Sequence, residues 1–300
     1  MIKVPWLRVL PQETLNSALK RQMEFLHLSL SETAKLTAYK IAHRHHGGYC
    51  PELIRLFSVM LEEQEEPLLR HTLYPLLTPF LSEYSFHEYQ DKMGSTKIIE
   101  SFGARAIALK KHICFCPQCI EEQKKQYGTC YFKLGWQIKD LSICLKHNCN
   151  LWQTEELNNI HNKILNPNLL PLLSSQRLEN DRQGKLLAQT VESILTAPKI
   201  YYINRNTWVE YFINLAARHH YKLRLAGRLS DRPVLYIKNI AKSAEMFWGK
   251  TWLMQRKINM EKNVQFALSG NWLRYLIILK AIAPSLELID AIQDIKTGHM

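Results

Sequence analysis

Residues that bind metal ions recur at close spacing near the middle of the chain. Cys116-Pro-Gln-Cys119 is followed, after 24 intervening residues, by Cys144-Leu-Lys-His147. Two residues between paired ligands allow a tight turn to aim both side chains at one ion, and two such turns supply the four ligands of tetrahedral zinc. The spacing therefore predicts a zinc site formed by Cys116, Cys119, Cys144 and His147.

The predicted ligand set also indicates what the ion does. Three thiolates and one imidazole complete a tetrahedral coordination sphere, which leaves no position for a water molecule or a substrate. Such an ion stabilises the fold and takes no part in chemistry. We therefore expect structural zinc. The alternative interpretation is that these residues are simply reduced cysteines of a cytosolic protein.

Other candidate ligands lie close to this motif in the sequence. Cys114 precedes the first pair, Cys130 lies between the pairs, Cys149 follows the second pair, and His112 is a nearby imidazole. We expect the thiols to be small buried groups and the imidazole to be an ordinary surface side chain. The sequence leaves open whether Cys114 or another of these thiols replaces a proposed ligand.

The segment between the ligand pairs must bring them together. A short helix is expected over residues 120–126, followed by a break at Tyr127-Gly128 and a strand-like stretch that ends near Trp136. Aromatic side chains near a small metal site usually supply the apolar core that the metal cannot, so Trp136 is expected to pack rather than to stack on bases. Asp140 is the carboxylate we expect to support His147.

Helical patterns precede the metal motif. Apolar residues at three- and four-residue steps predict a helix that has Pro11 in its first turn and contains Leu15 and Met23. Ser29 and Glu32 have the spacing of a capping box and predict the start of a second helix. The N-terminal part of the chain is therefore expected to be helical.

The metal segment resembles the zinc-binding core of the TniQ family. The similar features are CPxC, Tyr127-Gly128, the aromatic stretch that ends in Trp136, and CxxH followed by an apolar residue, here Leu151. The block from His71 to Phe80 and the proline-led opening at Val4-Pro5 resemble TnsD-type members of the family. Together these features cover about the first half of the chain.

The resemblance implies a role in choosing the target of DNA transposition. It implies a non-catalytic adaptor that binds double-stranded target DNA and recruits an AAA+ ATPase regulator. Short family members can instead take their target from a CRISPR effector ribonucleoprotein. TnsD-type members usually continue well beyond this length, so the chain is expected to be either a truncated piece or a short member.

Composition is compatible with this interpretation. The 300 residues are 46% hydrophobic, which is ordinary for a globular chain with two or three small domains. No apolar run approaches the length of a membrane-spanning helix. Seven cysteines, clustered around a metal motif, favour a reducing cytosol. We expect a cytoplasmic protein that associates with the nucleoid when it is bound to DNA, because its net charge of +12 favours a polyanionic partner.

Most of the surplus charge lies in one segment. Between Arg218 and Lys257 the chain has ten Lys and Arg residues and two acidic residues. A cap at Ser230 or Asp231, Pro233 in a first turn and a break at Gly249 predict two helices, which together suggest a helix-turn-helix. The alternative is a solvated basic face. The predicted DNA contacts are Arg228, Arg232, Lys238, Lys242 and Lys250.

Two other classes of protein use closely spaced cysteines or a basic helical segment. A zinc deaminase would need an open coordination position and a His-x-Glu acid and base beside the metal, which this motif lacks. We therefore do not expect an enzyme. A zinc-containing helix-turn-helix transcription regulator is the alternative function.

The predicted fold class is mainly α, with helical domains around a small zinc-ribbon or zinc-finger module and helix-turn-helix-like elements. Four segments are expected. They are a helical TniQ-like N-terminal domain (1–103), a zinc-binding module (104–155), a connecting helical region (156–217) and a basic helical region (218–300).

Overall fold

The computed structural model divides the chain into two compact units. Unit 1 comprises Met1–Pro75 and Met93–Thr196, and unit 2 comprises Leu76–Lys92 and Ala197–Met300. The four domains expected from the sequence remain a prediction. The structure describes residues 6–29, 32, 51–62, 64–80, 110, 112–157, 175–178, 183–221, 223–229, 232–237, 240–249, 253, 265–267 and 272–298.

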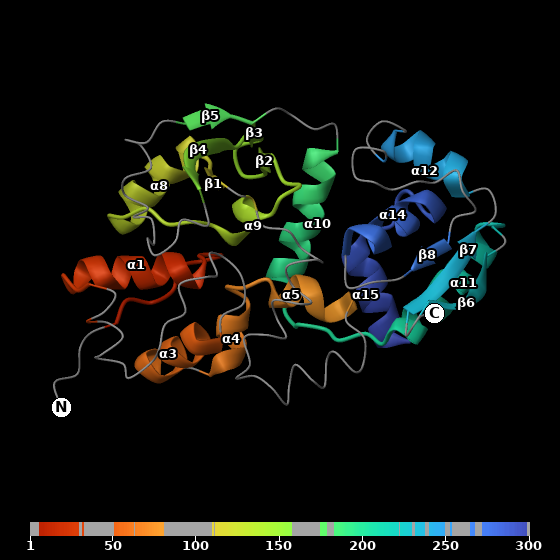
Figure 1. The fold of residues 1–300 in the computed structure, drawn as a ribbon, viewed down its shortest axis with the longest axis horizontal. Helices are drawn as coiled ribbons and strands as arrows, with labels where there is room; N and C mark the ends of the chain where they lie inside the picture. Colours follow the sequence, from red (N-terminus) through yellow and green to blue (C-terminus); the bar gives the residue numbers. More distant parts are fainter. Residues whose placement is uncertain are drawn as a thin grey trace. The chain divides into compact units, whose positions relative to one another are not determined.

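Helices dominate the described chain, as predicted, and the first of them belong to unit 1 (Figure 1). The first helix begins later than expected, because Pro11 lies in a turn and Thr14 is the N-cap, accepting a hydrogen bond from the backbone N–H of Ser17. The early helical elements are α1 (Leu15–Phe25), α3 (Pro51–Leu61), α4 (Glu65–Leu69), α5 (Tyr74–Leu77), which spans the unit boundary, and the 3-10 helix η1 (Thr78–Phe80).

The predicted capping box is present. The backbone N–H of Ser29 donates to the Glu32 carboxylate at 2.7 Å, and the backbone N–H of Glu32 donates to Ser29 Oγ at 3.2 Å. Glu32 is helical, and this reciprocal pair confirms the capping box predicted from the sequence. The remainder of the predicted second helix lies outside the described residues.

The metal motif lies in a small α/β region of unit 1, in which β1, β4 and β5 lie beside α8 (Figure 1). Strands β1, β4 and β5 form an antiparallel sheet in that order, and β2 pairs with β3 as a separate hairpin. The elements are β1 (His112–Phe115), α8 (Pro117–Tyr127), α9 (Leu134–Gln137), β2 (Ile143–Cys144), β3 (Cys149–Asn150), β4 (Trp152–Leu157), β5 (Ser175–Arg177) and α10 (Gly184–Thr196).

The segment between the ligand pairs follows the prediction in part. Helix α8 includes the expected 120–126 helix and ends at Gly128, whose φ of +69° is the left-handed conformation that glycine adopts readily. The expected strand-like stretch is wrong, because Lys133 makes only an isolated β-bridge to Glu13 and the next residues form α9, a single helical turn.

Unit 2 has a helical core and a small antiparallel sheet. Strands β6, β7 and β8 pair in that order. Its elements are α11 (Arg205–Arg218), β6 (Leu223–Leu229), β7 (Arg232–Ile237), α12 (Ile240–Trp248), β8 (Gln265–Ala267), α14 (Trp272–Ile282) and α15 (Leu288–Thr297).

The sheet corrects one prediction. The helix expected to start at Pro233 is a strand until Ile237, and a helix begins only at Ile240. The six residues of β7, which include β-branched and aromatic types, each pair with a residue of β6, and this pairing outweighs the local helical signals in the sequence. Most of the second helix predicted after Gly249 lies outside the described residues.

Aromatic side chains fill the core of unit 2. Trp208, on α11, is fully buried, and its ring lies 5.7 Å from that of Phe80 and 5.0 Å from that of Tyr275 between ring centroids. Its indole Nε1 donates to the carbonyl oxygen of Pro79 at 2.7 Å, so its polar atom is paired despite the burial. Within the described part of the chain, no helix is long and apolar enough to cross a membrane.

Candidate metal centre

Two short turns position the predicted ligands. Cys116 follows strand β1 and is the N-cap of α8, with Pro117 at the start of the helix and Cys119 in its first turn. The backbone N–H of Ile120 donates to the Cys116 carbonyl at 3.0 Å, which fixes this turn. Cys144 ends β2, and His147 lies in the turn that leads to β3.

The four predicted ligand atoms converge in unit 1. They lie within 4.8 Å of one another, the three cysteines are buried, and His147 is partly buried. The His147 Nδ1 lies 3.4 Å from Cys116 Sγ, 3.3 Å from Cys119 Sγ and 3.7 Å from Cys144 Sγ. Cys119 and Cys144 Sγ are 3.6 Å apart.

These separations fit a tetrahedral zinc ion. Zinc–sulfur bonds of about 2.3 Å and zinc–nitrogen bonds of about 2.0 Å at tetrahedral angles place the ligand atoms roughly 3.5 to 3.8 Å apart. The observed separations of 3.3 to 3.7 Å lie close to that range. The cluster therefore has the donor set and the dimensions to hold one metal ion, and its soft thiolates favour zinc over a hard cation.

A carboxylate orients the imidazole. His147 Nε2 donates to Glu122 Oε1 at 3.1 Å, which leaves Nδ1 free to bind a metal. Lys146 Nζ donates to the other Glu122 oxygen at 2.6 Å, and the hydrogen bonds from Lys146 and His147 lower the pKa of the Glu122 carboxyl. Glu122, rather than the expected Asp140, is therefore the supporting carboxylate. Glu122 lies one helical turn after Cys119 on α8, and this spacing is the sequence feature that could have identified it.

The thiols share protons when no metal is bound. Hydrogen bonding to Cys119 and to Cys144 raises the pKa of Cys116, whereas the hydrogen bonds from Cys116 and Cys119 lower the pKa of Cys144. A metal ion must displace the remaining thiol protons when it binds.

The additional thiols separate into two kinds. Cys114 and Cys130 are buried and lie near backbone carbonyls, at 3.8 Å from that of His112 and 3.9 Å from that of Ile120. They lie outside the four-residue cluster, as expected for buried thiols. Cys149 differs, because its Sγ is 3.6 Å from Cys116 Sγ.

Trp136 packs into the core beside the metal ligands. Its side chain is 5% exposed and belongs to the cluster of buried apolar residues that includes Phe132, Ile113 and Cys119. Lys133 Nζ lies 5.7 Å from the centroid of the Trp136 ring. The expected packing role of Trp136 is confirmed.

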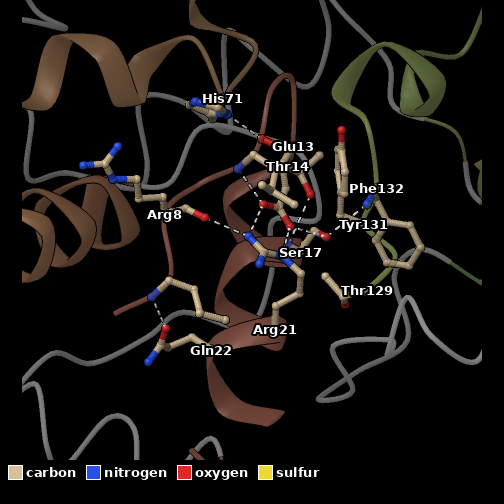
Figure 2. Close-up of polar contacts among 12 residues, drawn as sticks. Arg8, Glu13, Thr14, Ser17, Arg21, Gln22, His71, Thr129, Tyr131 and Phe132 are labelled. Carbon is tan, nitrogen blue, oxygen red and sulfur yellow. Dashed lines mark hydrogen bonds and ion pairs between the residues drawn. The ribbon is translucent and has the colours of Figure 1, made fainter. Parts of the chain in front are cut away.

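A buried ion pair, which no motif in the sequence predicts, accompanies the metal region in unit 1. Glu13 is 0% exposed and Arg21 is 6% exposed, and the guanidinium donates to both carboxylate oxygens at 2.7 Å and 2.6 Å (Figure 2). Ser17 Oγ and the backbone N–H of Leu10 also donate to this carboxylate. Burial raises the pKa of the Glu13 carboxyl, and Arg21 opposes that rise.

The same N-terminal segment is hydrogen-bonded to the chain just before α9. The backbone N–H of Thr14 donates to the Phe132 carbonyl at 2.9 Å, and the backbone N–H of Leu134 donates to the Gln12 carbonyl at 2.8 Å. The backbone N–H of Phe132 donates to Ser17 Oγ at 3.0 Å (Figure 2). Residues 10–21 are thereby fixed to the segment that joins the two ligand pairs.

The predicted DNA contacts are described only in part. Lys242 is exposed on α12, whereas Arg228 and Arg232 lie on the paired strands β6 and β7. Lys238 and Lys250 lie outside the described residues. The basic segment therefore includes a β-hairpin and a helix.

Comparison with known proteins identifies two similarities. Residues 4–151 match the model of the TniQ family, and this match contains all four residues of the metal cluster. The chain is also 20% identical over 249 residues to the transposon Tn7 transposition protein TnsD of Escherichia coli, in an alignment that covers 76% of this chain and 47% of that protein. The chain thus spans about half the length of the curated relative it matches.

Proposed function

This chain belongs to the TniQ family, and on that premise we propose that it is a non-catalytic target-selection protein of DNA transposition. It marks a target and presents that target to an AAA+ ATPase regulator. The match of residues 4–151 to the family carries the proposal, because that segment holds both the metal cluster and the buried Glu13–Arg21 pair.

The chemistry of the metal cluster supports an adaptor. Cys116, Cys119, Cys144 and His147 supply four donors, which fill the coordination sphere of a tetrahedral ion. Bound zinc would be structural, holding the start of α8 against the β2–β3 turn. The protein's own residues then provide a fixed surface for partners rather than a reacting group.

Two modes of target recognition follow from the proposal. In the first, the chain binds double-stranded DNA itself, with Arg228, Arg232, Lys238, Lys242 and Lys250 as contacts to the phosphate backbone. The net charge of +12 favours such binding through release of counterions. In the second, the chain docks on a CRISPR effector ribonucleoprotein, which reads the target by base pairing.

A retention experiment with two baits separates these modes. The purified chain is applied at moderate salt to an immobilised DNA duplex and to an immobilised CRISPR effector ribonucleoprotein, and the AAA+ ATPase is then added. Direct recognition predicts retention on the duplex, and RNA-guided recruitment predicts retention on the ribonucleoprotein. Either mode predicts that the ATPase is retained only when this chain is present. A chain that binds neither bait nor the ATPase contradicts the proposal.

A matched pair of variants tests the phosphate contacts. Lys242→Gln removes an exposed positive charge from α12, whereas Lys139→Gln removes an exposed positive charge near α9. Direct DNA binding predicts that the first variant binds the duplex more weakly, with a smaller salt dependence, and that the second is unchanged. Equal effects of the two variants would indicate attraction by net charge alone.

A zinc-containing transcription regulator is the second candidate function. It shares the metal cluster and the basic segment, but it requires no ATPase partner. The ATPase step of the experiment above therefore distinguishes the two, since a regulator would bind a duplex and fail to retain the ATPase.

A further inference from the structure

One thiol at the edge of the metal cluster has no place in the closed coordination sphere. Cys149 Sγ lies 3.6 Å from Cys116 Sγ, which equals the separation of Cys119 and Cys144, two proposed ligands of the same ion. Cys149 itself lies outside the set of four mutually close donor atoms. It therefore contacts one ligand from outside.

Cys149 is also the accessible thiol of this region. Among the described cysteines it alone is partly exposed, and the others are buried. It lies on β3 as the register partner of Cys144 on β2, so the hairpin holds it close to the ligands. Oxidation of a thiol depends on its exposure and on a second thiol near enough to resolve the first product. Cys149 and Cys116 meet both requirements.

We propose that Cys149 and Cys116 form an oxidation site that releases the metal ion. The oxidant is a peroxide, which reaches the partly exposed Cys149 first. The two sulfur atoms need to approach by about 1.5 Å to reach the length of a disulfide bond.

The reaction balances in two steps. The Cys149 thiolate attacks the peroxide, its sulfur is oxidised to a sulfenic acid, and the peroxide is reduced to water. The Cys116 sulfur then attacks the sulfenic sulfur, the S–S bond forms, and hydroxide leaves with a proton as a second water. Cys116 can no longer bind the ion as a thiolate, so three donors remain and the ion dissociates.

The consequence is a redox-sensitive metal centre. Loss of the ion removes the connection between the start of α8 and the β2–β3 turn. The hydrogen bonds between residues 10–21 and Phe132 and Leu134 involve none of the four ligands. Reduction of the disulfide restores the thiolate, and the centre binds zinc again. The inference concerns the metal centre and is independent of the partner that the protein recruits.

The test uses the full chain loaded with zinc. Hydrogen peroxide is added in the presence of a metal-sensitive dye, and the disulfide is located by mass spectrometry of peptides. We expect release of the ion together with a Cys116–Cys149 disulfide, and recovery of zinc binding after treatment with dithiothreitol. The Cys149→Ser variant should retain its ion under conditions in which the wild-type chain releases it.

The control is Cys130→Ser, which removes a buried thiol of the same region that lies outside the cluster. It should release zinc at the wild-type rate. Three results would overturn the proposal: equal release from Cys149→Ser and wild type, a disulfide that joins Cys119 to Cys144, or a purified chain that holds no metal. Because the disulfide is located in the wild-type chain, a variant that folds poorly doesn't obscure the answer.

Discussion

The metal region of unit 1 and the aromatic core of unit 2 are stabilised in different ways. In unit 1, four ligands from two short turns meet within 4.8 Å, beside a modest apolar cluster. In unit 2, Phe80, Trp208 and Tyr275 contact one another from distant parts of the sequence and are buried without a metal. Small regions with little core depend on metals, whereas larger aromatic cores do not.

Removal of the metal is expected to have the largest effect and to act on one unit only. Structural zinc contributes on the order of 10 kcal/mol to the folding of a small domain. A strong chelator should therefore raise backbone hydrogen exchange across residues 112–157 and leave α11 and α14 protected. Mass-spectrometric hydrogen exchange resolves the two regions in one experiment.

The matched variant for this experiment is Cys119→Ser, which removes a ligand, compared with Cys130→Ser, which does not. The first should reproduce the effect of the chelator and the second should not. Equal protection of residues 112–157 with and without metal would show that the comparison between the units is wrong.

Truncation of the aromatic core should give the opposite pattern. Trp208→Ala removes a fully buried indole that packs on Phe80 and Tyr275, and such a change costs about 3–5 kcal/mol. We expect the unfolding midpoint of unit 2 to fall while the zinc content of the chain stays at the wild-type value. Denaturant titration with metal analysis measures both. Loss of zinc in this variant would mean that the two units fold as one.

We expect the stability of unit 1 to depend on the buried ion pair as well as on the metal. Arg21→Met leaves the Glu13 carboxylate buried without its partner, which costs about 3–5 kcal/mol. Unfolding of the zinc-loaded chain by denaturant should reveal this loss. The double variant Glu13→Leu, Arg21→Met has no uncompensated charge and should recover much of the stability. If the single variant were as stable as wild type, the pair would not hold the N-terminal segment in place.

The smallest expected effect concerns the residue that orients His147. Glu122→Gln weakens the contact to His147 Nε2, and loss of such a partner typically lowers metal affinity by 10- to 100-fold. Glu122 is substantially exposed, so we expect about a tenfold change, near the lower limit of that range. Competition with a zinc chelator measures the affinity. Glu121→Gln, at an exposed neighbouring position, is the control and should leave the affinity unchanged.

The difference between the metal region and the aromatic core also explains which features could be predicted from the sequence. The metal ligands could be predicted from their spacing, because each pair closes a local turn that does not depend on the rest of the fold. These ligands are Cys116, Cys119, Cys144 and His147. The capping box at Ser29 and Glu32 is local in the same sense and is confirmed. Glu122 lies one helical turn after Cys119, but this spacing does not by itself show that its carboxylate contacts His147, which lies on a different turn.

Features that depend on distant contacts were not predictable in this way. The partnership of Glu13 with Arg21, and of their segment with Phe132, depends on how residues 10–21 pack against a region more than a hundred positions away. The residues of β7 were predicted to be helical because Ser230 or Asp231 and Pro233 suit the cap and the first turn of a helix, but pairing across the β6–β7 hairpin determines the structure. Local periodicity does not carry that information.

The coordination of the metal is the central claim, and X-ray absorption spectroscopy of the purified chain tests it most directly. The account predicts one zinc ion per chain with three sulfur ligands and one nitrogen ligand, and no oxygen in the first coordination sphere. A folded chain without zinc, or a zinc ion that carries a water ligand, would contradict it.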